Sequence, residues 1–283
     1  MTPKKPLGIF LQGGGALGAW QAAALELFAA RGLRFDVVMG FSIGAVNGSA
    51  LAFDRLPEAL ARWRELTGGA LKLSLKLAPP SLCSIAPLRA FFENARDEVA
   101  AKAALRADFT IVTACIAERA PINARFTPGG LDGWDGPLIE HAAASCAIPL
   151  VFPPVDVLYR GRRVRLVDGG VPMKAPIDFS PLAGCADVIV LEMIRADEAG
   201  RGSWTPWRSL DSRCREAARG LIDEGLEGLR RGKNPPRVHR LAPSIALEPM
   251  MLDFRAAGLA KMLLQGTSDA SAFLDGSASF RAS

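Results

Sequence analysis

The sequence predicts an α/β fold with a mostly parallel central sheet. Two short apolar runs, at 7–11 and 35–39, are each followed by a glycine-containing turn and a segment of small, helix-compatible residues. Strands that alternate with helices in this order pair in parallel, since the helix returns the chain across the sheet by a right-handed crossover. With 283 residues, of which 49% are hydrophobic and 22% charged, the chain is globular and long enough for a full core.

The other elements follow in order along the chain. A first helix is expected over about 16–31, where Gly32 stops it. Residues 71–80 alternate Leu with Lys or Ser and end in two prolines, so we expect a lid-like excursion there rather than core. A domain boundary, if the chain has one, falls near 195–205. The remaining predicted strands are 109–116, 123–127, 155–158, 164–167 and 187–192, of which 155–158 and 164–167 form a hairpin. The remaining predicted helices are 57–66, 137–147, 209–231 and 253–264.

A serine stands in the turn after the second strand, between Gly40 and Gly44 in the run Gly-Phe-Ser-Ile-Gly. Glycines flank the serine of such a GxSxG turn because the turn is too tight for β-carbons, and its strain lifts the hydroxyl into the open. The small residues at 45–52 supply the helix that should follow. The motif therefore predicts Ser42 as a nucleophile.

The turn after the first strand is rich in glycine and allows two interpretations. Gly13, Gly15 and Gly18 match the dinucleotide pattern GxGxxG, but that use needs an acid at the end of the second strand, and Asp36 stands at its start. The alternative is an oxyanion hole, in which bare backbone N–H groups at a helix N-terminus stabilise a tetrahedral intermediate. We favour this second use because a candidate nucleophile ends the adjacent strand.

A serine nucleophile needs a base, and the chain has only two histidines. His141 lies within a predicted helix and His239 among basic residues, so both are typical of packed or surface positions. Asp168 ends an apolar strand and precedes two glycines, in a turn that can present a carboxylate to a site. We expect Asp168 to be the base, and a Ser–His–Asp triad that uses His239 stays open as the alternative.

Four motifs in one order make the chain resemble the patatin-like phospholipases. They are the glycine-rich loop from Gly13 to Gly18, the GxSxG turn at 40–44, the block from Ala144 to Pro154 (Ala-Ser-Cys-Ala-Ile-Pro-Leu-Val-Phe-Pro-Pro), and Asp-Gly-Gly at 168–170. The resemblance covers about 7–178. The chain differs from the family pattern at Leu17, where many members carry Arg or Lys. It also differs at Lys174, where an Asn commonly follows the last motif.

The resemblance implies a three-layer α/β/α sandwich with 7–178 as the catalytic core and 179–283 as a strand and helices that complete or cover the same domain. It implies a Ser42–Asp168 dyad that hydrolyses phospholipid or acylglycerol esters without a cofactor or metal. The N–H groups of Gly13, Gly14 and Gly15 would form the oxyanion hole. The supporting glycines of the motifs would be Gly18, Gly40, Gly44, Gly169 and Gly170. Acyl transfer or thioester cleavage by the same dyad, and a non-catalytic lipid-binding module, remain alternatives.

Charge and composition bear on location and partners. The net charge of +5 and the pI near 9.1 are mild, and no basic motif interleaved with aromatic residues indicates nucleic acid. Five widely spaced cysteines, no secretory leader and no run of 18 apolar residues lead us to expect a cytoplasmic protein. A lipid hydrolase of this kind must reach a bilayer from water, so peripheral contact with an anionic membrane is expected at 71–77, through Lys72 and Lys76, with 250–264 as the weaker candidate.

Overall fold

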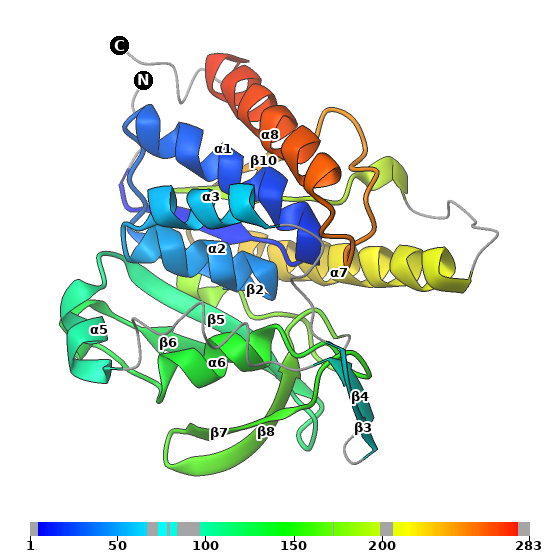
Figure 1. Cartoon of the computed structure of the whole chain (residues 1–283). Coiled ribbons are helices and arrows are strands. Elements are labelled where there is room, and N and C mark those ends of the chain that lie inside the picture. Colours follow the sequence, from blue (N-terminus) through cyan, green and yellow to red (C-terminus); the bar gives the residue numbers. More distant parts are fainter. Residues whose placement is uncertain are drawn as a thin grey trace.

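The structure is a computed structural model that describes residues 5–66, 73–77, 80–83, 97–171, 173–198 and 206–276 (Figure 1). An eight-stranded, mostly parallel sheet forms its centre, with the strand order β10-β9-β1-β2-β5-β8-β7 and β6 paired to β5. Its strands are β1 (Leu7–Leu11), β2 (Val37–Phe41), β5 (Asp108–Cys115), β6 (Ala120–Phe126), β7 (Val155–Tyr159), β8 (Arg162–Asp168), β9 (Asp187–Leu191) and β10 (Arg237–Leu241). The helices are α1 (Gly18–Ala30), α2 (Ile43–Ala52), α3 (Leu56–Glu65), α5 (Glu98–Ala104), α6 (Leu138–Ser145), α7 (Pro206–Arg230) and α8 (Ala256–Gly276), with 3-10 turns at Gly15–Leu17, Pro128–Gly130, Ser180–Leu182 and Ala196–Glu198.

Strands β10, β9, β1, β2 and β5 run parallel, as the alternation of strands and helices predicts. All five residues of β1 and all five of β9 are buried, because helices cover both faces of this part of the sheet. The other three strands are antiparallel: β6 and β8 pair with β5, and β7 pairs with β8 in the predicted hairpin.

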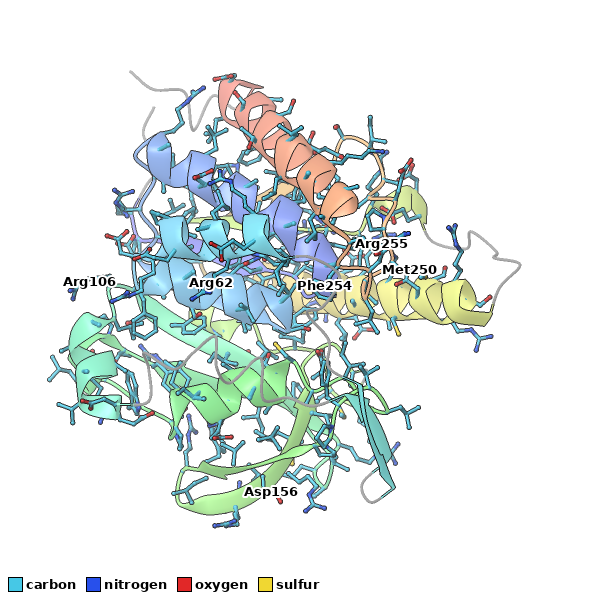
Figure 2. All side chains as sticks on the ribbon, in the orientation of Figure 1. Arg62, Arg106, Asp156, Met250, Phe254 and Arg255 are labelled. Atoms are coloured by element: carbon cyan, nitrogen blue, oxygen red, sulfur yellow. The ribbon has the colours of Figure 1, made fainter. Side chains whose placement is uncertain are left out.

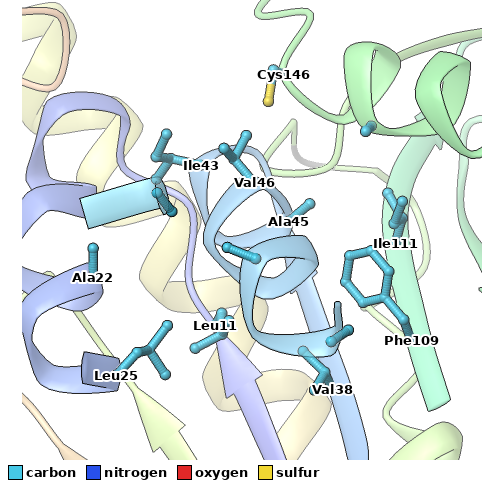
Figure 3. Packing of buried hydrophobic residues seen from close by; sticks show 14 of the residues in the cluster. Leu11, Ala22, Leu25, Val38, Ile43, Ala45, Val46, Phe109, Ile111 and Cys146 are labelled. Atoms are coloured by element: carbon cyan, nitrogen blue, oxygen red, sulfur yellow. The ribbon is translucent and has the colours of Figure 1, made fainter. Parts of the chain in front are cut away.

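Two hydrophobic cores lie on the two faces of the sheet and make the three layers. On one face α1, α2, α3, α6 and α8 pack on alternate strand residues, and Figure 3 shows Leu11, Val38 and Ile111 of the strands meeting the helices there. On the other face, the strand residues Phe10, Met39 and Val190 pack against α7. The predicted α/β/α sandwich with a mostly parallel sheet is confirmed.

Three elements differ from the sequence-based expectation. Strand β10 was not predicted, because its sequence Arg-Val-His-Arg-Leu carries polar residues that only an edge strand, paired on one side to β9, tolerates. The short helix α5 was also missed. Helix α8 runs to Gly276 instead of ending near 264. Gly266 lies where α8 crosses α1, and a Cβ there would lie 2.1 Å from the Trp20 carbonyl oxygen.

The segment expected to leave the core forms a separate two-stranded sheet of β3 (Leu73–Leu77) and β4 (Pro80–Cys83). Lys72 lies outside the described residues, as does the Lys76 side chain. In the other candidate membrane segment, Leu259 and Met262 are buried, whereas Leu264 is exposed. Within the described ranges, no helix combines the length and the hydropathy that crossing a bilayer requires.

Candidate active site

Ser42 lies at the carboxyl end of β2, immediately before the first residue of α2. Its backbone has φ 53° and ψ −132°, which is a strained conformation for a residue with a side chain and is expected at a nucleophile elbow. The turn is tight because α2 starts directly against β1: a Cβ at Gly44 would lie 2.1 Å from the Leu11 carbonyl oxygen, and one at Gly40 would lie 2.8 Å from the backbone of Gly44. The Ser42 carbonyl oxygen accepts hydrogen bonds from the Ala45 and Val46 N–H groups, so the serine lies at the positive end of the α2 dipole.

Asp168 reaches Ser42 because β2 and β8 end against the same edge of β5. Strand β6 occupies one edge of β5 over Phe109–Cys115. On the opposite edge, β2 pairs as far as Phe41 with Val112, and β8 arrives from the other direction, where Asp168 pairs with Thr113. The carboxyl ends of β2 and β8 therefore meet head-on at consecutive residues of β5. This arrangement brings the predicted nucleophile and the predicted base together.

Local contacts fix the Asp168 carboxyl group. Its Oδ1 accepts a 2.7 Å hydrogen bond from the N–H of Gly170, and its own N–H donates to the Ala147 carbonyl at 3.0 Å. Burial raises the pKa of Asp168 to about 6, although the Ser42 hydroxyl and the Gly170 N–H both lower it. Oδ2 is buried, and no described group makes a hydrogen bond of ordinary length and angle to it, so it is available to accept a proton. The carboxyl group is thus a stronger base than an exposed aspartate.

The glycine-rich loop lies against the serine. A Cβ at Gly13 would be 2.8 Å from the Ser42 Cβ and 2.5 Å from the Phe41 ring, so only glycine allows this approach. On either side of the loop, the Gln12 N–H donates to Leu191 and the Ala16 N–H to Met251. Between them, the N–H groups of Gly13, Gly14 and Gly15 donate to no other described residue. Asp36 bonds the Leu7 N–H at the opposite end of β1, away from where a dinucleotide ribose would need an acid.

Ser145, in the block from Ala144 to Pro154, holds the backbone of the nucleophile turn in place. The Ser42 N–H donates to the Ser145 hydroxyl at 2.8 Å, and this hydroxyl donates to the Val112 carbonyl at 2.7 Å. The elbow is thereby tied to β5, and the Ser42 N–H is not available to an oxyanion. The only indication of this role in the sequence is that Ser145 belongs to the block from Ala144 to Pro154.

Neither histidine lies where a triad would need it. His141 donates from Nε2 to the Asp135 carbonyl at 2.9 Å, and burial lowers its pKa to about 4. His239 lies on β10, three strands from β2, and its Nε2 is 2.9 Å from Asp187 Oδ1 at the amino end of β9. The thiol of Cys146 is close enough to Asp168 to be affected by its charge, and burial raises the pKa of this thiol well above the usual range.

The two departures from the family pattern lie in different surroundings. Leu17 is fully buried in the core under α1. Lys174 is exposed, and its N–H donates to the Arg119 carbonyl. Three of the motif glycines are closely packed: a Cβ at Gly169, Gly170 or Gly18 would collide with Phe41 or Ile43. Across the described ranges, no three His, Cys, Asp or Glu side chains gather as a metal site.

Comparisons with known proteins agree with these motifs. A model of the family described as patatin-like phospholipase matches residues 9–179, which include Ser42 and Asp168. Uncharacterized NTE family proteins of Mycobacterium bovis and Mycobacterium tuberculosis are each 33% identical over 198 residues, which is 67% of this chain and 49% of theirs. The chain thus spans about half the length of the curated relatives it matches.

Two solved structures are similar at low identity. VipD from Legionella pneumophila aligns over 96% of this chain and 67% of its own, with 14% identity and a TM-score of 0.45. The type III effector protein ExoU aligns over 97% and 54%, with 13% identity and a TM-score of 0.42. Because the family model matches more than half of the 283 residues, the chain belongs to the patatin-like phospholipase family.

Proposed function

We propose that the protein is a serine acyl hydrolase that cleaves lipid esters through a Ser42–Asp168 dyad. Family membership supports lipid hydrolase activity and supplies the substrate class. The observation that carries the proposal of the dyad is the head-on meeting of β2 and β8 on β5, which brings a strained serine and a buried carboxylate together.

In the first step Asp168 Oδ2 accepts the Ser42 proton while Ser42 Oγ attacks the ester carbonyl carbon. A carboxylate with a pKa of about 6 is mostly ionised at neutral pH yet basic enough to accept the proton in the transition state. The protonated Asp168 then donates to the leaving alcohol. The ionised Asp168 next takes a proton from water as this water attacks the acyl-serine, and returns it to Ser42 Oγ as the fatty acid leaves.

The oxyanion that forms on the carbonyl needs donors that are already in place. The N–H groups of Gly13, Gly14 and Gly15 lie next to Ser42 and have no described protein acceptor. The N-terminus of α2 adds a positive potential at the same point. We assign the oxyanion hole to this loop, and its backbone role explains why Leu17 can replace a cationic side chain.

Fluorophosphonate labelling tests the proposal. Ser42→Ala should remove both the label and the hydrolysis of a short-chain ester. Ser49→Ala is the matched control, since Ser49 is also buried in the α2 region but its hydroxyl bonds only the Val46 carbonyl among described contacts. Full labelling and turnover by Ser42→Ala would refute the proposal. A panel of phospholipid and acylglycerol esters, assayed for free fatty acid, then distinguishes hydrolysis from acyl transfer.

A further inference from the structure

The segment 247–251, between β10 and α8, is held by side chains of α7 that the proposed mechanism does not use. Arg215 is only 9% exposed and donates to the carbonyl oxygens of Leu247 and Pro249. Its guanidinium is also paired with Asp211 Oδ2 at 2.8 Å and with Glu198 Oε2 at 2.9 Å. Figure 2 shows Met250 of this segment beside α7.

Asp211 extends this network to the next residue of the segment. Its Oδ2 holds Arg215, and its Oδ1 accepts a 2.8 Å hydrogen bond from the Met251 N–H. Asp211 and Arg215 are one helical turn apart on the same face of α7 and are both largely buried. The two side chains therefore hold the backbone at three alternate residues, 247, 249 and 251.

Met251 then contacts the glycine-rich loop directly. Its carbonyl oxygen accepts a 2.7 Å hydrogen bond from the Ala16 N–H. It also lies so close to Gly15, whose φ is +56°, that a Cβ there would be 2.0 Å away. The Gln12 N–H anchors the other side of the loop on Leu191. The unpaired N–H groups of 13–15 thus lie between two backbone hydrogen bonds, one to Leu191 of β9 and one to Met251.

We propose that Asp211 and Arg215 are positioning residues for the oxyanion hole, acting through the Met251 carbonyl. The inference rests on the proposed function, because it assigns a purpose to the loop only if the loop stabilises an oxyanion. Loss of the Asp211 carboxylate releases the Met251 N–H, loosens its carbonyl and lets the loop donors move from the oxyanion. Interactions made only in the transition state affect kcat and leave KM unchanged.

Three variants test this role. Asp211→Ala should lower kcat about 10- to 100-fold with little change in KM, less than the full loss of an oxyanion donor because the donors are displaced rather than removed. Asp211→Asn keeps an oxygen for the Met251 N–H but turns its NH2 group toward the Arg215 guanidinium, so it should lose less activity than Asp211→Ala. Asp187→Asn is the control: Asp187 is fully buried and paired with Arg237 and His239 at the opposite end of the sheet. It should lower the melting temperature without a specific loss of kcat.

Hydrogen exchange makes the test independent of turnover. Exchange at the Ala16 amide should accelerate in Asp211→Ala and stay slow in Asp211→Asn and Asp187→Asn. Unchanged Ala16 exchange in Asp211→Ala, or faster exchange with unchanged kcat, would overturn the inference. An equal loss of kcat in the Asn and Ala variants would also overturn it. Should Ser42→Ala remain active, the proposed function fails, whereas the exchange result still reports on the Asp211–Met251–Ala16 connection.

Discussion

Replacing Asp168 with Asn separates the activity of the site from the stability of the fold. The amide has the shape of the carboxyl group and keeps an oxygen for the Gly170 N–H, but it cannot accept a proton from Ser42. We expect esterase activity to fall by roughly 10²-fold or more, as it does when a general base is removed. We also expect the variant to be more stable than the wild type at alkaline pH.

The magnitude follows from the pKa of Asp168. Burial raises it from 3.8 to about 6, so at pH 8 the folded protein holds an ionised carboxylate at a cost of about 3 kcal/mol, at about 1.4 kcal/mol for each pH unit of difference. Between pH 3.8 and 6 the folded state binds more protons than the unfolded state, so the free energy of unfolding falls as the pH rises. The favourable contribution of the neutral Asp168 to the free energy of unfolding is fully present below pH 3.8, the pKa in the unfolded chain, and is lost above pH 6.

Urea unfolding at two pH values measures the effect. The free energy of unfolding of Asp168→Asn should exceed that of the wild type by up to about 3 kcal/mol at pH 8 and by only about 1 kcal/mol at pH 4.5. In the wild type, kcat/KM should fall as the pH drops through about 6, where Asp168 becomes protonated.

The control is Asp187→Asn, which removes a buried carboxylate that is paired with Arg237. It should destabilise the protein at pH 8, because the loss leaves a cation without its partner. A destabilised or fully active Asp168→Asn variant, or a stability gain that does not depend on pH, would refute the reasoning about the base.

Three further predictions concern the histidines, the glycine-rich loop and the membrane. His141→Ala/His239→Ala should keep most of the esterase activity at a temperature where circular dichroism shows it folded, since both rings bond elsewhere; an inactive but folded variant would favour the triad. Gly13→Ala should lower kcat by roughly 10²-fold because its methyl group would collide with the Phe41 ring and Ser42, and wild-type kcat would contradict this. Cosedimentation with anionic vesicles should show salt-sensitive binding that Lys72→Glu/Lys76→Glu weakens; binding indifferent to these charges would discard the docking prediction.

Much of the fold could be predicted from the sequence. The residues 7–11 match β1 residue for residue, and the apolar run before Ser42 matches most of β2, because strands buried on both faces are continuously apolar. Membership of the patatin-like phospholipases was predicted from four short motifs and is confirmed. The roles of Ser42, Asp168 and the loop glycines stay predictions, now with a geometry that brings them together.

The rest depends on tertiary contacts that leave little trace in a local pattern. Strand β10 looks polar because it lies at an edge, and α8 contains Gly266 because it crosses α1 closely. The hydrogen bond from Ser42 to Ser145 joins residues far apart in the chain, as does the contact of Met251 with Ala16. Hydrophobic periodicity shows which face of a helix or strand is buried, but it does not show which other element packs against that face.

The shared edge of β5 has a consequence for how the site can fail. Side chains along a strand alternate between its two faces, so sliding β8 by one residue along β5 would bring Val167 or Gly169 opposite Thr113 in place of Asp168. Such a slip moves the carboxylate to a different place relative to Ser42, and it also turns the buried side chains of Val164 and Leu166 away from the core. The distance between nucleophile and base is thus set by the residues of β5 with which β2 and β8 pair. Single-residue insertions or deletions in β8 should therefore abolish activity, while conservative substitutions at its exposed positions should leave activity nearly unchanged.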